Sequence, residues 1–189
     1  GYEENLDLLY GLIDETSVAG CKKYFIHARN AILNGLSPKK NRMIPKLRYQ
    51  DAIIVKHRYS DIEFYLNGGL DDISEIQNNI SFFVGVMIGR KIYDDPMFLR
   101  IIESEIFGNK DIITREHIVF EYLKYALPLS KKGMSNYMLL RHLFSLYYNT
   151  SSSKKWKKFL HDIIQHDKDI MLINDFEEFT YEEKISSYS

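Results

Sequence analysis

Apolar and polar positions change their spacing along the chain, and two patterns alternate in its first half. Three short apolar runs are rich in aromatic and β-branched residues, as strands are: 24–26, 63–66 and 84–88. Apolar residues recur at helical spacing in three other segments: 5–14, 49–56 and 72–80. This alternation predicts parallel βα units. Three strands are too few to close a barrel, so we expect their buried faces to need neighbours outside these residues.

The segment 30–47 interrupts this alternation. It contains Gly35, Pro38 and Pro45, and this many helix- and strand-breaking residues exclude one regular element. We expect a long loop with at most a helical turn, and loops of this length in compact domains are often functional.

Only helical patterns follow Pro96. Thr114 is expected to cap a helix that stops before Pro128, because proline lacks the N–H that a helix interior needs. A second helix is predicted over 135–148, and Ser152 is expected to cap a third. The fold class is therefore α/β followed by all-α, with a boundary near 95–102. The acidic tail from Asp175 is expected to be frayed.

The composition is that of an ordinary globular protein, with 45% hydrophobic and 27% charged residues and a net charge of −1. The charge is nevertheless segregated. Residues 20–58 contain ten Lys or Arg and one acid, a net charge of +9, and residues 129–158 contain seven Lys or Arg and no acid. Phosphate backbones respond to such local fields, although two solvated basic faces would give the same pattern.

Glycines follow two of the predicted strands. Asn67-Gly68-Gly69 comes after the second strand and Gly89-Arg90 after the third, about one βα unit apart. In eight-stranded α/β barrels the loops after the last two strands commonly bind phosphate. Glycine lets backbone N–H groups approach phosphate oxygens, and arginine can pair with phosphate through two hydrogen bonds. The alternative is that these glycines only form tight turns.

Three other residues carry candidate chemistry. His27 ends the first predicted strand, where a barrel would point it at the active-site mouth, although a single histidine there is often structural. Lys39 and Arg42 lie in the punctuated loop and could contact a large anionic substrate, or simply be solvated. The only cysteine, Cys21, excludes an internal disulfide, and we expect it to be a small packing residue.

Several longer motifs make the chain resemble the A-type tRNA-dihydrouridine synthases in order and spacing. They are His27-Ala28-Arg29, Gly35-Leu36-Ser37-Pro38-Lys39, Asn41-Arg42, Ile44-Pro45, Leu47-Arg48-Tyr49, Leu66-Asn67-Gly68-Gly69 and Gly85-Val86-Met87-Ile88-Gly89-Arg90. Further on, Tyr93 with Pro96, Glu105-Ile106-Phe107-Gly108, Arg141-His142 and the helix with Trp156 also match. The resemblance extends to about Leu160.

The resemblance implies the last strands and helices of a flavin-binding (β/α)8 TIM barrel over residues 1–98. It implies a helical tRNA-binding domain, a C-terminal bundle with the frayed acidic tail, over residues 99–189. The cofactors would be FMN and NADPH, and the implied flavin-binding residues are His27, Asn67, Gly68, Gly69, Gly89 and Arg90. The implied tRNA contacts are Lys39, Arg42 and Arg141.

The implied reaction is reduction of uridine to dihydrouridine in the D loop of tRNA. NADPH reduces the flavin, the flavin gives hydride to the uracil, and a protein acid protonates the ring. The target base must leave its stack to reach the flavin. In this family the acid is a cysteine of an early barrel loop, so no catalytic residue is expected in this chain, and Cys21 is not that cysteine.

The remaining expectations are a monomer as the full-length enzyme, no metal, no membrane segment, and a cytoplasmic or organellar location. Three alternatives stay open at this point. The chain could belong to another FMN-dependent barrel oxidoreductase that acts on a small molecule. It could also be a non-catalytic RNA-binding module, or a phosphate-binding barrel fragment with negligible affinity for RNA.

Overall fold

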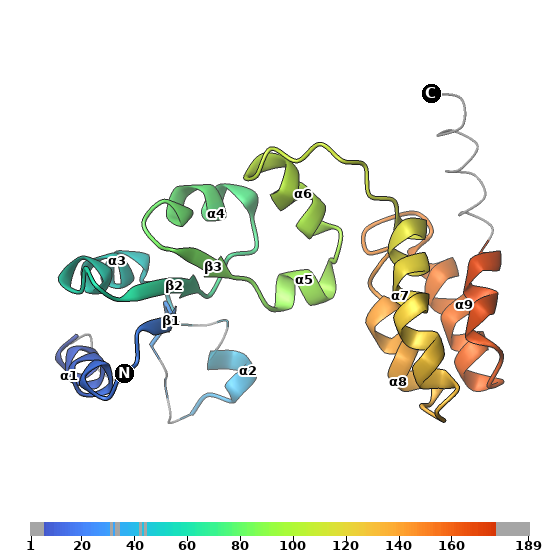
Figure 1. Cartoon of the computed structure of the whole chain (residues 1–189), viewed down its shortest axis with the longest axis horizontal. Coiled ribbons are helices and arrows are strands. Elements are labelled where there is room, and N and C mark those ends of the chain that lie inside the picture. Colours follow the sequence, from blue (N-terminus) through green and yellow to red (C-terminus); the bar gives the residue numbers. More distant parts are fainter. Residues whose placement is uncertain (1–5, 31, 33–34, 42, 44, 177–189) are drawn as a thin grey trace. The chain divides into compact units, whose positions relative to one another are not determined.

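The structure is a computed structural model that describes residues 6–30, 32, 35–41, 43 and 45–176. Its residues form two compact units, Gly1–Gly89 (unit 1) and Arg90–Ser189 (unit 2), which Figure 1 colours along the sequence. The boundary expected at 98/99 falls instead in the first turn of a helix of unit 2. The roles assigned to the two parts stay predictions.

A parallel sheet lies at the centre of unit 1. Its strands β1 (Lys23–His27), β2 (Glu63–Asn67) and β3 (Gly85–Met87) follow the order β1-β2-β3. Both pairings are parallel, which confirms the three predicted strands and the βα units between them. Strand β3 is shorter than the apolar run that predicted it.

Helices connect the strands. They are α1 (Asp7–Val18), α2 (Pro38–Asn41), α3 (Tyr49–Arg58) and α4 (Ile73–Ile80). As predicted, α3 buries its apolar face, and the Asp72 side chain caps α4 by accepting from the Ser74 amide at 2.8 Å. Helix α1 continues to Val18, four residues past the end expected at residue 14. Its backbone hydrogen bonds extend beyond the apolar pattern, and the helix ends shortly before Gly20, which has a φ of 101°.

One face of the sheet is buried against helices. Phe64 and Leu66 of β2 are fully buried there. The Tyr24 ring stacks on Phe64 with 5.6 Å between ring centroids, and its hydroxyl lies 2.7 Å from Oγ1 of Thr16 in α1. This face therefore fixes the helices of unit 1 to the strands.

The opposite face of the sheet is arranged in layers across the strands. From the amino to the carboxyl ends of the strands, the layers are Lys23–Glu63, Phe25–Tyr65–Gly85 and His27–Asn67–Met87. The Phe25 and Tyr65 rings stack with centroids 4.8 Å apart. Phe25 is nevertheless 59% exposed, so the described residues leave most of this side chain of β1 uncovered. An apolar run indicates a strand but not whether both of its faces have neighbours.

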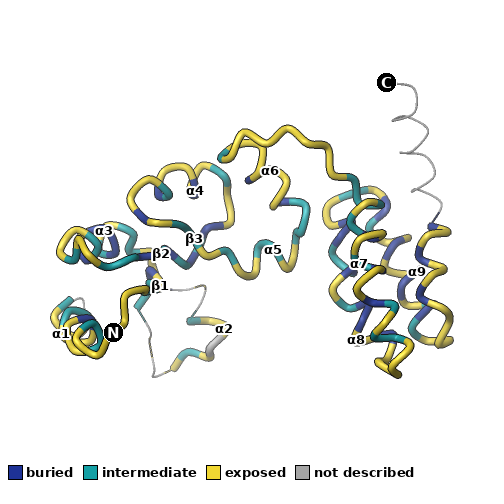
Figure 2. Tube along the Cα trace, viewed as in Figure 1, coloured by how far each residue is buried: buried dark blue, intermediate teal, exposed yellow. Residues whose placement is uncertain are grey.

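The described residues of unit 2 form only helices and the turns between them. Its elements are α5 (Arg90–Asp94), α6 (Phe98–Glu105), α7 (Arg115–Ser130), α8 (Asn136–Leu140), the 3-10 helix η1 (Arg141–Leu143), α9 (Ser153–Gln165) and the 3-10 helix η2 (Ile170–Asp175). Buried side chains from α7 to η2 form one core. Figure 2 colours the buried positions of these helices dark blue along the Cα trace. Thr114 caps α7 as predicted, by accepting from the His117 amide.

Two helix boundaries in unit 2 were predicted wrongly. Helix α7 continues through Pro128 to Ser130, because an exposed proline in the last turn removes only one hydrogen bond near a helix end. The helix expected over 135–148 is only α8, followed by η1 and turns. The third helix begins after Ser152 as predicted, but the Ser152 side chain makes no cap hydrogen bond to it.

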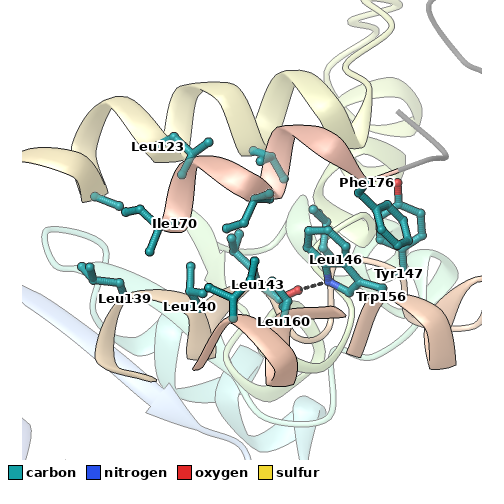
Figure 3. Close-up of a cluster of buried hydrophobic side chains, with 14 residues drawn as sticks. Leu123, Leu139, Leu140, Leu143, Leu146, Tyr147, Trp156, Leu160, Ile170 and Phe176 are labelled. Atoms are coloured by element: carbon teal, nitrogen blue, oxygen red, sulfur yellow. Dashed lines mark hydrogen bonds between the residues drawn. The ribbon is translucent and has the colours of Figure 1, made fainter. Parts of the chain in front are cut away.

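Side chains from the neighbouring helices explain why the helix expected over 135–148 ends at Leu140. Two of them occupy carbonyl oxygens that this helix would have used: the Tyr122 hydroxyl donates to Leu139 and Trp156 Nε1 to Leu143. Arg115 Nε donates to the Leu146 carbonyl in the turns that follow. The tryptophan bond is 2.6 Å long and buried. Figure 3 shows it inside the core, next to Tyr147 and Phe176.

No sequence pattern predicted η2. This 3-10 helix buries Ile170 and Ile173, and Phe176 at its end meets the Trp156 ring edge-on at 5.0 Å. The frayed tail was expected from Asp175, and residues 177–189 lie outside the described part of the chain. Among the helices that the structure describes, none is long and apolar enough to cross a membrane.

Candidate functional site

The carboxyl ends of β2 and β3 lie side by side. Asn67, the last residue of β2, is paired with Met87, the last residue of β3. The Gly68-Gly69 pair directly follows Asn67, and Gly89 comes two residues after Met87. Both glycine motifs therefore leave the same edge of the sheet from neighbouring strands.

The turn after β2 needs its glycines. Gly68 and Gly69 have φ angles of 107° and 66°, in the region that side-chain-bearing residues rarely adopt. A Cβ on Gly69 would lie 2.5 Å from Cδ1 of Leu47, and one on Gly68 would lie 3.3 Å from Nε2 of His27. The turn is thus enclosed by Leu47 on one side and by the His27 ring on the other.

Gly89 differs from this pair, because nothing lies within 4 Å of a Cβ placed on it. Neither its conformation nor its packing in the described structure requires glycine. The amides of Gly68, Gly69 and Gly89 donate no backbone hydrogen bond to another described residue. Backbone N–H groups of this kind, gathered at the edge of a sheet, can bind the oxygens of an anion such as phosphate.

The chain before α3 is attached to this edge by three hydrogen bonds. The Ala28 amide donates to the Asn67 carbonyl at 2.9 Å, and the Arg48 amide donates to the Ala28 carbonyl at 2.9 Å. The Tyr49 hydroxyl donates to the Gly68 carbonyl at 2.8 Å. Burial raises the pKa of Tyr49 to about 12, with nearby Glu75 adding to the shift, so the hydroxyl keeps its proton at neutral pH.

His27 and Asn67 share the layer at the carboxyl end of the sheet. The exposed His27 ends β1, as predicted, and its ring lies against Gly68. The Asn67 side chain contacts the Met87 sulfur at 3.6 Å. Both residues present polar side chains on the open face, where a planar ligand could meet them.

The basic loop is described only in part. Lys39 lies in α2 and is exposed. Asn41 closes the loop, because its side chain bonds the Ile32 carbonyl at 2.6 Å and accepts from the Ile32 amide at 2.7 Å. Arg42, the second predicted RNA contact, lies outside the described residues.

The last two predicted site residues belong to unit 2. Arg90 is the first residue of α5 and follows Gly89 directly in the chain. Arg141 lies in η1 rather than in a continuous α-helix, is partly buried, and donates from Nε to Nε2 of His142 at 3.2 Å. Arg141 thus belongs to unit 2, whereas the edge of the sheet belongs to unit 1.

Sequence reasoning missed several residues on the open face. Phe25, Tyr65 and Met87 lie in the same layers as, or next to, His27 and Asn67. Alternation along each strand could have found them, since every second residue of a strand points to the same face. Tyr49 carried no such signal, because its hydrogen bond to Gly68 depends on how α3 packs.

Cys21 lies on the surface of unit 1. Cys21 is exposed, and its Sγ contacts the Lys23 carbonyl at 3.5 Å, so the expectation that it packs in the core is wrong. It precedes β1, at the end of that strand opposite to His27. In the part of the chain that is described, no group of three or more His, Cys, Asp or Glu side chains could hold a metal ion.

Comparison with known proteins identifies the family. Residues 1–184 match the dihydrouridine synthase family. The chain is 33% identical over 153 residues to a tRNA-dihydrouridine(20/20a) synthase of Pseudomonas putida, which covers 80% of this chain and 46% of that protein. A protein with the same name from Synechocystis is 31% identical over 162 residues, which cover 85% of this chain and 48% of that protein. Another from Vibrio parahaemolyticus is 36% identical over 140 residues, which cover 74% of this chain and 43% of that protein.

The chain thus spans about half the length of the curated relatives that it matches. The matched stretch includes most of both compact units, and the family resemblance seen in the sequence motifs is confirmed. This chain belongs to the dihydrouridine synthase family.

Proposed function

We propose that this chain is the part of a tRNA-dihydrouridine synthase that holds the flavin phosphate and contacts tRNA. The whole enzyme would reduce uridine to dihydrouridine in the D loop of tRNA. One observation carries the proposal: the two glycine motifs leave neighbouring parallel strands at one edge of the sheet, in a chain of this family. The similar proteins named above carry that activity in their names.

The residues at this edge fit the phosphate of FMN. The amides of Gly68, Gly69 and Gly89 would bind its oxygens, and Arg90 would add a positive charge. His27 and Asn67 would bind the polar rim of the flavin ring from the layer below. The flavin supplies hydride transfer from NADPH to the uracil ring. The acid that protonates the ring would come from outside these residues, since Cys21 lies at the opposite end of β1.

The open face of the sheet supports a barrel interior. In the described residues β1 and β3 each have a single strand neighbour, so the sheet has two free edges. A groove with a volume of about 310 Å³ runs beside β1 and includes exposed Leu8 and Leu12 of α1 and Phe25. We infer that further parallel strands close a (β/α)8 barrel over this groove and over the stacked Phe25 and Tyr65 rings.

The basic residues support tRNA as the substrate. Lys39 is exposed in unit 1, and unit 2 exposes four lysines on α9: Lys154, Lys155, Lys157 and Lys158. Phosphate contacts of this kind supply affinity without reading sequence. Helical unit 2 would therefore position tRNA, with Arg141 as one of its contacts.

Binding of FMN to the full-length enzyme tests the phosphate site. Gly89→Ala should weaken FMN binding by about tenfold, since the added methyl group keeps the phosphate from the backbone N–H, and tenfold corresponds to about 1.4 kcal/mol. Gly11→Ala is the matched control, because Gly11 also has open space around it. Flavin fluorescence would measure both affinities. Equal affinities in the two variants would rule out a phosphate at Gly89.

Two further measurements separate the proposal from its alternatives. The isolated 189 residues should not form a stoichiometric complex with FMN, because the three described strands do not close the proposed barrel. In the full-length enzyme, Lys39→Glu and Arg141→Glu should each weaken tRNA binding and reduce the slope of log affinity against log salt by about one. They should leave FMN affinity unchanged. Unchanged tRNA affinity and an unchanged salt slope in both variants would refute these two tRNA contacts.

A further inference from the structure

We propose that Tyr49 is a positioning residue for the phosphate site, which holds the peptide group between Gly68 and Gly69 in one orientation. This inference rests on the proposed function, because it concerns how the same site is kept in shape. The contact that carries it is the hydrogen bond of 2.8 Å from the Tyr49 hydroxyl to the Gly68 carbonyl.

The peptide group between Gly68 and Gly69 couples this hydrogen bond to the side of the turn that is proposed to bind phosphate. The Gly68 carbonyl and the Gly69 N–H belong to the same planar trans unit, so they point in opposite directions. A hydroxyl that fixes the oxygen on one side therefore fixes the N–H on the other. The Gly69 N–H is one of the groups proposed to bind the phosphate.

The turn itself does not fix this orientation. Both of its residues are glycines with positive φ, and glycine adopts both signs of φ at little cost. A peptide between two glycines can rotate, and then the carbonyl oxygen would face the anion and repel it. Tyr49 selects the orientation that presents the N–H.

Tyr49 is well placed to act as a fixed support. It is the first residue of α3, and the preceding residue, Arg48, is bonded through its amide to Ala28 at the end of β1. Ala28 is in turn bonded to Asn67. The tyrosine is therefore attached to the ends of both strands that flank the turn. Leu47 packs against Gly69 from the same segment and limits its movement further.

The Tyr49→Phe variant tests this inference, because it removes the hydroxyl and keeps the ring. Tyr59→Phe is the matched control, since the Tyr59 hydroxyl bonds Asp14 at 2.8 Å within the same unit and lies in no proposed site. The first measurement is the residual dipolar coupling of the Gly69 N–H in the full-length enzyme freed of FMN, which reports its orientation without any ligand. The second is the shift of the Gly69 amide resonance during titration with inorganic phosphate.

Tyr49→Phe should change the Gly69 dipolar coupling while those of β2 stay the same, and should weaken the phosphate response about tenfold. Tyr59→Phe should match the wild type in both measurements. An unchanged Gly69 coupling in Tyr49→Phe would overturn the inference, even if phosphate still binds. If the coupling changes but the wild-type Gly69 amide does not respond to phosphate, the phosphate site of the proposed function fails and Tyr49 loses its positioning role.

Discussion

Replacement of Gly69 by alanine should destabilise unit 1 by about 2 kcal/mol, in two separable parts. An alanine held at a φ of 66° costs about 1 kcal/mol of backbone strain. Its methyl group would also lie 2.5 Å from Cδ1 of Leu47. Leu47 is 36% exposed, so it can turn toward solvent and lose its packing, which costs about 1 kcal/mol more.

The cost of displacing the Leu47 side chain should disappear when this residue is shortened to alanine. In a Leu47→Ala background, the Gly69→Ala substitution should cost only the strain of about 1 kcal/mol. The double-mutant cycle would then give a coupling of about 1 kcal/mol, which exceeds the deviation of a few tenths expected for independent sites. Gly89→Ala should change stability by less than about 0.5 kcal/mol, since it has neither strain nor a clash.

Hydrogen exchange of the β2 amides would measure these free energies within unit 1. Trp156 lies in unit 2, so its fluorescence serves as an internal reference that should not change. An equal cost of Gly69→Ala in both backgrounds would show that Leu47 does not enclose the turn. A cost no larger than that of Gly89→Ala would refute both parts of the reasoning.

Other substitutions test the core of unit 2 and the ionisation of Tyr49. Trp156→Phe should cost about 2 to 3 kcal/mol in urea unfolding followed by circular dichroism, since it removes the buried hydrogen bond from Nε1 to the Leu143 carbonyl and leaves part of the indole volume empty; a loss below about 1 kcal/mol would contradict this. Asn136→Ala should cost about 1 to 2 kcal/mol in the same assay, because its buried amide bonds Asp167 and the Lys168 carbonyl, and Asn136→Asp should not restore the loss. Tyr49 has a folded pKa of about 12 against about 10 when unfolded, so unit 1 should lose stability as pH rises from 10 to 12. Tyrosinate absorbance would follow this ionisation near pH 12. If a Tyr49→Phe variant still showed the same absorbance change, the ionisation would belong to another tyrosine.

The strands and the glycine edge could be predicted from the sequence because local signals specify them. Apolar runs of aromatic and β-branched residues locate β1 and β2, and parallel βα order makes the carboxyl ends of neighbouring strands meet. The adjacency of the two glycine motifs followed from that rule. Whether their amides bind phosphate is a question of ligand chemistry, and it stays a prediction.

The parts that could not be predicted depend on contacts between distant residues. The predicted helix over 135–148 has a sound apolar period, but Tyr122 and Trp156 occupy its carbonyls from other helices. Tyr49 reaches Gly68 across 19 positions, and no local pattern encodes that contact. The exposure of Phe25 could not be predicted either, because an apolar residue in a strand gives no information about which face has a neighbour.

Strand β1 makes the behaviour of these 189 residues depend on their concentration. Its outer edge has no strand partner in the described structure, and the Phe25 ring is exposed beside it. An unpaired edge with an apolar side chain is a template on which another polypeptide can add a strand. At low concentration unit 1 should remain dispersed, whereas at high concentration copies should associate through this edge. A dispersed preparation would therefore require either dilution or a polypeptide segment that pairs with β1.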